Sequence, residues 1–234
     1  MERPERATRR EPAGGTMRVV VVAGGKPVAD DARHLDGAGM VIAADGGAGW
    51  LHGLGCPPDL LVGDLDSTGP ELLAALERAG TRIERHPVQK DASDAELALG
   101  RATAAGDEVV LLGAMGGRRL DHELANLLLI ADPRWRGRVR DLRIVRGDTL
   151  VRAVHGGDRL GLEAPVGALV TLLAVGGDAE GVLTDGLRYP LHGERLAFGG
   201  SRGLSNVVAR APASVSLERG TLLVVEQLTE GVEP

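Results

Sequence analysis

The sequence predicts an α/β fold in two parts: an N-terminal α/β domain with a parallel sheet, followed by a C-terminal all-β sandwich domain. Between residues 17 and 141, short apolar runs alternate with helical patterns, which is typical of βα units. From residue 142 onward, short apolar segments are separated by Gly, Asp and Pro turns with no helical pattern between them. We therefore expect the two domains to cover residues 17–141 and 142–234.

The N-terminal strands are predicted from apolar runs, the clearest of which is RVVVVA, a continuous β-branched segment typical of a strand buried on both faces. Ser93 stands three residues before Glu96, which is the spacing of a helix capping box. The predicted strands are Arg18–Ala23, Val41–Ala44, Leu60–Val62, Thr81–Arg85 and Val109–Leu112, and the predicted helices are Pro70–Ala79, Asp94–Ala104 and Leu120–Ala131.

The C-terminal domain is predicted from closely spaced apolar segments that turn residues interrupt. These segments are Arg143–Val145, Leu150–Val154, Leu160–Leu162, Leu169–Ala174, Ser214–Leu217 and Thr221–Glu226.

Composition excludes several classes of protein. The charged residues sum to 27 − 33 = −6, so the chain has no basic excess for binding a nucleic-acid backbone. Cys56 is the one cysteine, which rules out an internal disulfide and favours a reducing compartment. No apolar run reaches the roughly 18 residues that a membrane helix needs. We expect a soluble, cytoplasmic enzyme that acts on a small substrate.

Residues 1–16 are rich in Arg, Glu, Pro and Gly and contain little that a core could bury. We expect a disordered leader there, with Met17 as a possible translation start. A targeting peptide is disfavoured, because the segment has no apolar centre and carries three glutamates.

Acidic residues follow most of the predicted parallel strands. In an open α/β sheet, ligands bind outside the carboxyl ends of the strands, so these residues are candidates for one site. Asp45 follows the second strand, Asp64 and Asp66 follow the third, and Asp91 and Asp94 follow the fourth. After the fifth strand the segment GGRRLDH adds Arg118, Arg119, Asp121 and His122.

Carboxylates gathered in this way repel one another unless a cation lies among them, and Mg²⁺ is the expected one. Gly46 and Gly47 allow backbone N–H groups to approach phosphate oxygens, and Lys90 would bind a phosphate as a compact charge. The pattern indicates transfer of a phosphoryl-type group from a nucleotide.

Simpler interpretations stand beside this one. Asp-x-Asp is a common turn composition, Asp94 could merely place charge at a helix start, and His122 could be an ordinary polar residue. A P-loop and a dinucleotide-binding glycine motif are both missing from the sequence. The acidic set is favoured as a site because four separate loops at one sheet edge carry it.

Several blocks of the chain resemble the thiamine pyrophosphokinase family, in family order and over nearly the whole length from Met17 to Leu228. The resemblance implies a nucleotide-binding α/β domain, a β-sandwich and a homodimer that binds thiamine between domains or subunits. It also implies that thiamine attacks the β-phosphorus of ATP with Mg²⁺ present, giving thiamine diphosphate and AMP. The blocks are ADGGAGWL (44–51), PDLLVGDLDS (58–67), QKDASDAELAL (89–99), GGRRLDHELANLLLI (116–130), GLRYPL (186–191) and SRGLSN (201–206).

The resemblance also implies roles for particular residues. Asp64 and Asp66 are similar to a metal-binding pair, with Asp45 nearby. Asp94, with Asp91 as a further candidate, resembles the acid near the transferred group and the thiamine hydroxyl. The residues implied to contact ATP are Asp45, Gly46, Gly47, Lys90, Arg118, Arg119, Asp121 and His122, and those implied to contact thiamine are Ser205 and Asn206.

The chain departs from the family pattern in two places. Two arginines precede Leu120-Asp121-His122 where the family usually has one, so either Arg118 or Arg119 could contact phosphate. No aromatic residue lies in 207–217, where some relatives carry a tryptophan that stacks on thiamine, which leaves Trp50, Tyr189 and Phe198 as candidates.

Three alternative functions stay open at this point. The first is the same transfer to another alcohol, such as a hydroxymethylpterin, and the motif at 201–206 favours thiamine over it. The second is a nucleotide sensor without catalysis, and the third is a structural dimerisation module.

Overall fold

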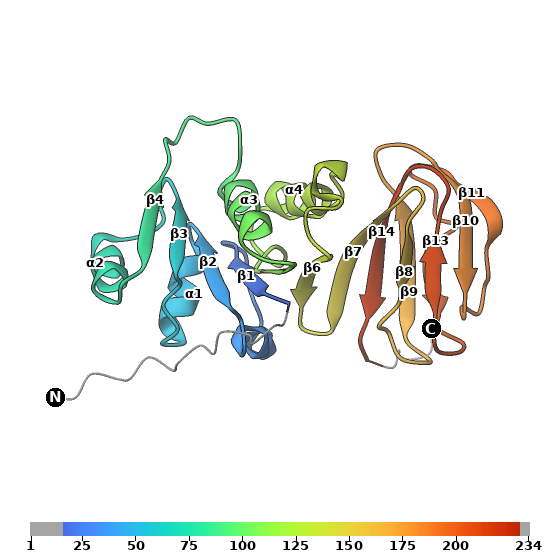
Figure 1. Cartoon of the computed structure of the whole chain (residues 1–234), viewed down its shortest axis with the longest axis horizontal. Helices are drawn as coiled ribbons and strands as arrows, with labels where there is room; N and C mark the ends of the chain where they lie inside the picture. The colour runs from blue at the N-terminus through green and yellow to red at the C-terminus, as the bar shows by residue number, and fades with distance from the viewer. Residues whose placement is uncertain (1–15, 230–234) are drawn as a thin grey trace. The chain divides into compact units, whose positions relative to one another are not determined.

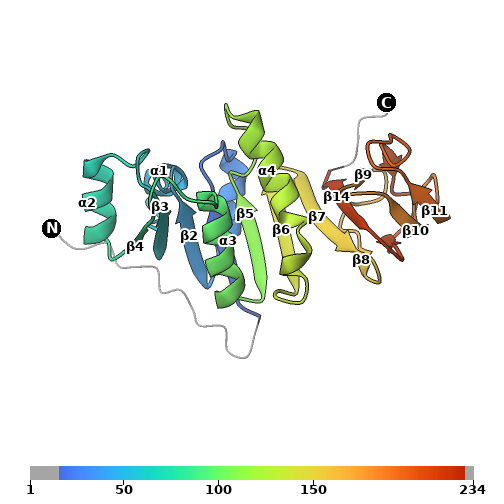
Figure 2. The ribbon, with the colours of Figure 1, turned by 90° about the horizontal axis from the view of Figure 1, so that it is seen from above.

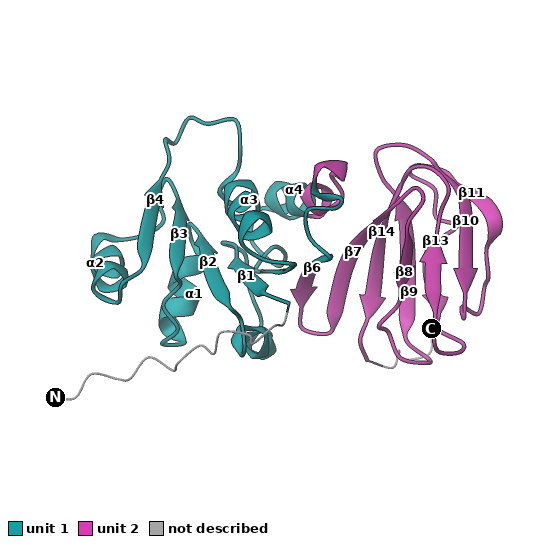
Figure 3. Cartoon of the chain, in the orientation of Figure 1, with its two compact units in different colours: residues 1–126, 135–142 teal, residues 127–134, 143–234 magenta. Residues whose placement is uncertain are grey.

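The computed structural model describes residues 16–229, so the predicted leader lies outside the described residues apart from Thr16. The chain has a mixed α/β fold, as predicted, and divides into two compact units (Figure 3). Within the described range, unit 1 comprises residues 16–126 and 135–142, and unit 2 comprises 127–134 and 143–229. The sequence assigns 127–134 to the first domain, because helical periodicity marks a helix without saying what its second half packs against.

Unit 1 is built on five strands whose neighbouring pairs are all parallel (Figure 1). Their order is β5-β1-β2-β3-β4. The valines at positions 19 to 22 are fully buried, and Val20 is aligned with Val41 on one side and Val110 on the other. The strands are β1 (Arg18–Val22), β2 (Met40–Ala44), β3 (Leu60–Gly63), β4 (Arg82–Arg85) and β5 (Glu108–Leu112).

Helices connect these strands and cover the sheet. The predicted helices at 70, 94 and 120 are confirmed, and α3 packs across β1, β2, β3 and β5 (Figure 2). Ser93 caps α3 by accepting a hydrogen bond from the N–H of Glu96 at 3.1 Å. The helical segments are η1 (Ala29–Leu35), α1 (Gly47–Gly53), α2 (Pro70–Arg78), α3 (Asp94–Ala105), α4 (Leu120–Ile130) and η2 (Pro133–Trp135). Within residues 16–229, none of these helices has the length and apolar character that crossing a bilayer requires.

The strand order reverses between β1 and β5. β1 leads to its neighbour β2, whereas β5 is reached from β4 by a crossover that returns past three strands. Ligands of open α/β sheets bind where the order reverses, at the carboxyl ends of the strands. The loops that follow β1 and β5 approach so closely there that a Cβ at Gly25 would lie 2.3 Å from the carbonyl oxygen of Gly113.

Unit 2 contains two sheets whose strand pairings are antiparallel. Their orders are β12-β9-β14-β7-β6 and β11-β10-β13-β8. One buried cluster draws on both sheets, with Val170 and Val224 from the first and Val182 and Val215 from the second. The strands are β6 (Asp141–Arg146), β7 (Thr149–His155), β8 (Arg159–Gly161), β9 (Leu169–Ala174), β10 (Ala179–Asp185), β11 (His192–Leu196), β12 (Asn206–Val207), β13 (Ser214–Ser216) and β14 (Thr221–Gln227).

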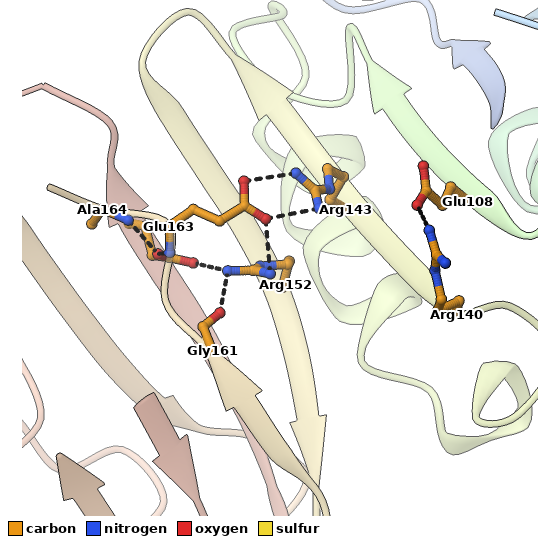
Figure 4. Close-up of polar contacts among 8 residues, drawn as sticks. Glu108, Arg140, Arg143, Arg152, Gly161, Glu163 and Ala164 are labelled. Carbon is orange, nitrogen blue, oxygen red and sulfur yellow. Dashed lines mark hydrogen bonds and ion pairs between the residues drawn. The ribbon is translucent and has the colours of Figure 1, made fainter. Parts of the chain in front are cut away.

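A buried ionic network joins β7 and β14 to the segment after β8 (Figure 4). Oε1 of Glu226, which has no exposed surface, lies 2.5 Å from Nη2 of Arg152. Oε2 of Glu226 accepts the N–H groups of Glu163 at 2.6 Å and Ala164 at 2.9 Å. The Glu163 carboxylate in turn binds Arg143 through both oxygens. The network therefore satisfies a buried carboxylate and fixes the chain at 163–164.

Candidate active site

The loop after β2 places Asp45 in an unusual backbone conformation. Its φ is +41°, in the left-handed region that side chains other than glycine rarely adopt. Its N–H donates to the carbonyl of Val62 at 2.9 Å, which continues the pairing of β2 with β3. At Gly47, a Cβ would lie 2.0 Å from the carbonyl oxygen of Val22, so the start of α1 requires glycine to pack on β1.

Asp45, Asp64 and Asp66 form an acid cluster, because one carboxylate oxygen from each lies within 4.8 Å of the others. Leu65 has a φ of +66°, and this turn keeps both neighbouring carboxylates near Asp45. The N–H of Asp66 donates to Oδ1 of Asp64 at 3.1 Å. The acid pair predicted from the third strand is thus joined to the acid predicted from the second.

The pKa values of two carboxylates in the cluster are shifted in opposite directions. The backbone N–H of Asp66 and the nearby Lys90 charge lower the pKa of Asp64, although burial opposes them. The negative charges of Asp64 and then Asp45 raise the pKa of Asp66. Three carboxylates at this spacing repel one another electrostatically, and a bound cation would relieve that repulsion.

The residues present fit a divalent cation. Oδ2 of Asp45 accepts a hydrogen bond from Ser67 Oγ at 2.7 Å, whereas Oδ1 is buried and has no hydrogen-bond partner. A buried carboxylate oxygen without a partner is unfavourable, and carboxylate oxygens are the ligands that Mg²⁺ prefers.

Lys90 lies between the acid cluster and the start of α3. Its Nζ is 3.4 Å from Oδ2 of Asp64 and 3.1 Å from Oδ1 of Asp94, and its side chain is 15% exposed. Burial disfavours its charged form, but the two carboxylates outweigh burial and raise the pKa of Lys90. Asp91, the other acid of this segment, is exposed.

Residues from the loops that follow all five parallel strands line a cavity of about 850 Å³ in unit 1. Asp64 and Asp66 are not in its lining, and the contacts of Lys90 and Asp45 connect them to it. Gly47 and Asp91 are also outside the lining. The predicted site residues that do line the cavity are Asp45, Gly46, Lys90, Asp94, Arg118, Arg119, Asp121 and His122.

The two arginines after β5 differ in their contacts. Arg119 binds Asp121 through two hydrogen bonds of 2.9 and 2.5 Å, and this pairing lowers the pKa of Asp121 to about 2. Arg118 makes no ion pair with any residue between 16 and 229. Both arginines are exposed. Because Arg119 is paired with Asp121, Arg118 is the one of the two whose guanidinium is available to an anion.

The sequence reasoning missed several cavity residues, among them Gly24, Ser67, Glu123 and Asn126. Gly24 lies in the loop after β1, and Ser67 binds Asp45. Glu123 accepts the N–H of Gly116 at 3.1 Å, and the buried Asn126 donates to the carbonyl of Ala114 at 3.0 Å, so both hold the loop after β5. The spacing of Glu123 and Asn126, three residues apart on one helix, is the signal that could have found them.

Unit 2 contains the two predicted thiamine residues. Ser205 has a φ of +54°, and its N–H donates to Thr171 Oγ1 at 3.1 Å. Asn206 is buried in the edge strand β12, with Oδ1 accepting the N–H groups of Tyr189 and Val207 and Nδ2 donating to Tyr189 O. A substrate contact would use the second N–H of Nδ2.

Two family descriptions match the chain: "Thiamin pyrophosphokinase, catalytic domain" over residues 32–140, and "Thiamin pyrophosphokinase, vitamin B1 binding domain" over residues 161–222. A thiamine pyrophosphokinase of Bacillus subtilis is 22% identical over 209 residues, which cover 88% of this chain and 96% of the relative. Thiamine pyrophosphokinase 2 of Oryza sativa is 26% identical over 180 residues, and the match spans 72% of this chain and 65% of the plant protein.

Solved structures agree with this match. The thiamin pyrophosphokinase family protein from Enterococcus faecalis is 26% identical, with a TM-score of 0.75 over 90% of this chain and 98% of its own. The thiamin pyrophosphokinase from Geobacillus thermodenitrificans is also 26% identical, with a TM-score of 0.75 over 90% and 97%. The predicted resemblance is confirmed, and the chain belongs to the thiamin pyrophosphokinase family.

Proposed function

We propose that this protein is a Mg²⁺-dependent transferase that moves the diphosphate of ATP to the hydroxyl of thiamine, forming thiamine diphosphate and AMP. The observation that carries the proposal is the acid cluster of Asp45, Asp64 and Asp66 beside a cavity at the carboxyl ends of parallel strands. The family match and the names of the relatives support the same reaction. We also propose, from the resemblance, a homodimer in which a nucleotide-binding parallel-sheet domain precedes a thiamine-binding β-sandwich.

Asp45, Asp64 and Asp66 would hold the cation. When bound there, Mg²⁺ supplies positive charge that neutralises phosphate oxygens and stabilises the charge that develops during transfer. The buried, unpartnered Oδ1 of Asp45 supports this role.

Lys90 and Arg118 would bind the phosphates. The ammonium of Lys90 is held at the edge of the cluster by Asp64 and Asp94, and Arg118 has no ion pair among the described residues that would compete with an anion. A guanidinium binds phosphate through two parallel hydrogen bonds, whereas an ammonium acts as a point charge.

Asp94 would accept the proton. In the proposed step, the thiamine hydroxyl oxygen forms a bond to the β-phosphorus, the bond between that phosphorus and the bridging oxygen to the α-phosphate breaks, and AMP leaves with the electron pair. The hydroxyl proton passes to the Asp94 carboxylate, whose Oδ1 lies 3.1 Å from Lys90 Nζ. Asp91 would lie further from the reaction.

AMP release from ATP and Mg²⁺, with and without thiamine, tests the proposal, with thiamine diphosphate followed by chromatography. Equal amounts of AMP and thiamine diphosphate, formed only when thiamine is present, are expected. Asp64→Asn and Asp66→Asn should abolish turnover and leave the fold intact. AMP formed only with a hydroxymethylpterin would assign another acceptor, and ATP binding without AMP for any alcohol would overturn the proposed transfer.

A further inference from the structure

Ser67 binds one oxygen of Asp45 and leaves the other without a hydrogen bond. We infer that Ser67 is a positioning residue: by donating to Oδ2 of Asp45, it fixes the carboxylate so that Oδ1 stays available to a divalent cation. The inference rests on the proposed function, because it takes the acid cluster as the cation site.

The contact joins two loops that the chain separates by 22 residues. Ser67 follows β3 and Asp45 follows β2, and the distance from Oγ to Oδ2 is 2.7 Å. A hydrogen bond from a hydroxyl to a carboxylate is charge-assisted and short, as this one is. The bond therefore holds the two loops of the cluster together as well as the carboxylate itself.

The orientation of the Asp45 carboxylate needs such a partner. The backbone φ of +41° fixes where the side chain leaves the chain, but the last torsion of an aspartate is broad and close to two-fold. Without Ser67, either oxygen could face the other two acids. The hydroxyl removes that freedom by occupying Oδ2.

A positively charged ligand would stabilise the unpaired Oδ1 of Asp45. Oδ1 of Asp45 is buried and has no hydrogen-bond partner, and the nearest charged groups of the cluster are the carboxylates of Asp64 and Asp66. Neither carboxylate can satisfy it while ionised, whereas a cation shared by all three would. Residues that orient metal ligands typically change metal affinity 10- to 100-fold when they are removed.

The surroundings of Ser67 suit this role. A Cβ built at Gly46 would lie 3.4 Å from Ser67 Oγ, so the glycine leaves room for the hydroxyl. Ser67 does not cap the following helix, since the N-cap position of α2 is Gly69 and carries no side-chain hydrogen bond.

The neighbouring Thr68 provides a matched control. Thr68 is buried, whereas Ser67 is exposed, and Thr68 Oγ1 has no hydrogen-bond partner among the described residues. Thr68→Val removes that hydroxyl with almost no change of shape, whereas Ser67→Ala removes the hydroxyl that binds Asp45. Ser67→Thr keeps a hydroxyl and should restore what Ser67→Ala loses.

The experiment measures Mn²⁺ binding to the full-length protein by electron paramagnetic resonance, with Mn²⁺ alone and with Mn²⁺ plus α,β-methylene-ATP. We expect Ser67→Ala to raise the Kd for Mn²⁺ about 10- to 100-fold, and Thr68→Val and Ser67→Thr to stay within about threefold of the wild type. The Mg²⁺ concentration that gives half the maximal rate should rise with it, while the KM for thiamine stays unchanged.

The outcomes separate this inference from the proposed function. Wild-type Mn²⁺ binding that Asp64→Asn abolishes but Ser67→Ala leaves intact would overturn the role of Ser67 and keep the cation site. Equal losses in Ser67→Ala and Thr68→Val would assign a general packing effect and also overturn it. A wild-type protein that binds no Mn²⁺ under either condition would remove the cation site, and with it both proposals.

Discussion

The side-chain amide of Asn206 forms hydrogen bonds with both the N–H and the carbonyl group of Tyr189. Its Nδ2 donates to the carbonyl of Tyr189 at 2.7 Å, and its Oδ1 accepts the N–H of the same residue at 3.0 Å. The amide thus replaces a strand partner for Tyr189, whose ring is about half exposed. Asn206 therefore stabilises the fold around Tyr189, independently of any contact with a substrate.

Asn206→Ala should lower the free energy of unfolding by about 1–3 kcal/mol, because it leaves the part-buried N–H of Tyr189 and the buried N–H of Val207 without the acceptor that they share. Urea denaturation measures this change. Asn206→Asp keeps the acceptor oxygen but loses the donor, so it should also destabilise the protein. A loss below 0.5 kcal/mol for Asn206→Ala would contradict this stabilising role.

The same variant tests the thiamine assignment. If Asn206 serves the thiamine side of the site, the KM for thiamine should rise more than the KM for ATP. Steady-state kinetics with each substrate varied in turn measures both constants. Equal increases in the two would argue against that assignment and favour a general distortion of the site, whereas a loss of folded enzyme would lower the apparent kcat and leave both KM values unchanged.

Glu226→Gln should destabilise unit 2 by about 3 kcal/mol, because it removes the buried carboxylate charge beside Arg152 and leaves that guanidinium with the half-exposed Glu163 as its remaining ion pair. Glu180→Gln is the matched control, since Glu180 pairs with Arg219 at the surface. Exposed ion pairs contribute at most about 1 kcal/mol. Similar unfolding free energies for the two variants would mean that the buried pair contributes no more than the exposed one.

Glu84 on β4 should make stability depend on pH. Hydrogen bonds from Arg101 on α3, which reaches both carboxylate oxygens, lower the pKa of Glu84 from 4.5 to about 2. Because the folded-state pKa is lowered, the stabilisation is complete above about pH 4.5 and is lost as the pH falls toward 2. Arg101 is half exposed, so we expect only about 1–2 kcal/mol.

Urea unfolding of the wild type and Glu84→Gln at pH 7, 5 and 4 measures this effect. The difference between the two should be largest at pH 7 and should begin to shrink at pH 4. Asp121→Asn serves as a contrast, since the pKa of Asp121 is also about 2 but the residue is exposed, so its unfolding free energy should not change measurably. A difference between wild type and Glu84→Gln that is constant with pH would contradict the prediction.

The strands of unit 1 could be predicted from the sequence because they are buried on both faces and therefore read as continuous apolar runs. The acids that follow them could be predicted for a related reason, since parallel strands end at one edge. α1 was missed because it begins in a run of glycines, and glycine weakens the helical pattern. Likewise β11 was missed, because most of its residues are exposed and no alternation marks it.

The finer contacts of the site were beyond the sequence because they depend on backbone conformations that no pattern encodes. The bond from Ser67 to Asp45 requires φ of +41° at Asp45, which residue types other than glycine seldom adopt. Which of Arg118 and Arg119 is available to bind phosphate likewise depends on which of them forms the ion pair with Asp121. A periodicity argument places residues on elements, whereas these contacts arise between loops.

Lys90 gives the last prediction, because it should act in opposite directions on two ligands. In the free protein, its ammonium contacts Asp64 and so competes with a cation for that carboxylate. With nucleotide present, the same ammonium would contribute to phosphate binding. Lys90→Met should therefore tighten the binding of Mn²⁺ alone, by about threefold or more, and lower kcat/KM for ATP by about 100-fold or more.

Arg82→Met is the control for this prediction, since Arg82 lies on β4 with a side chain that is 74% exposed and its loss changes the net charge equally. Metal binding measured by electron paramagnetic resonance and initial rates with ATP should both match the wild type in that variant. If Lys90→Met weakened Mn²⁺ binding together with ATP turnover, Lys90 would be supporting the acid cluster rather than competing for it. A long-range effect of net charge on Mn²⁺ affinity would be similar in Arg82→Met and Lys90→Met, since each variant removes one positive charge. A change in Mn²⁺ affinity that occurs only in Lys90→Met would therefore assign the competition to the contact between Lys90 and Asp64.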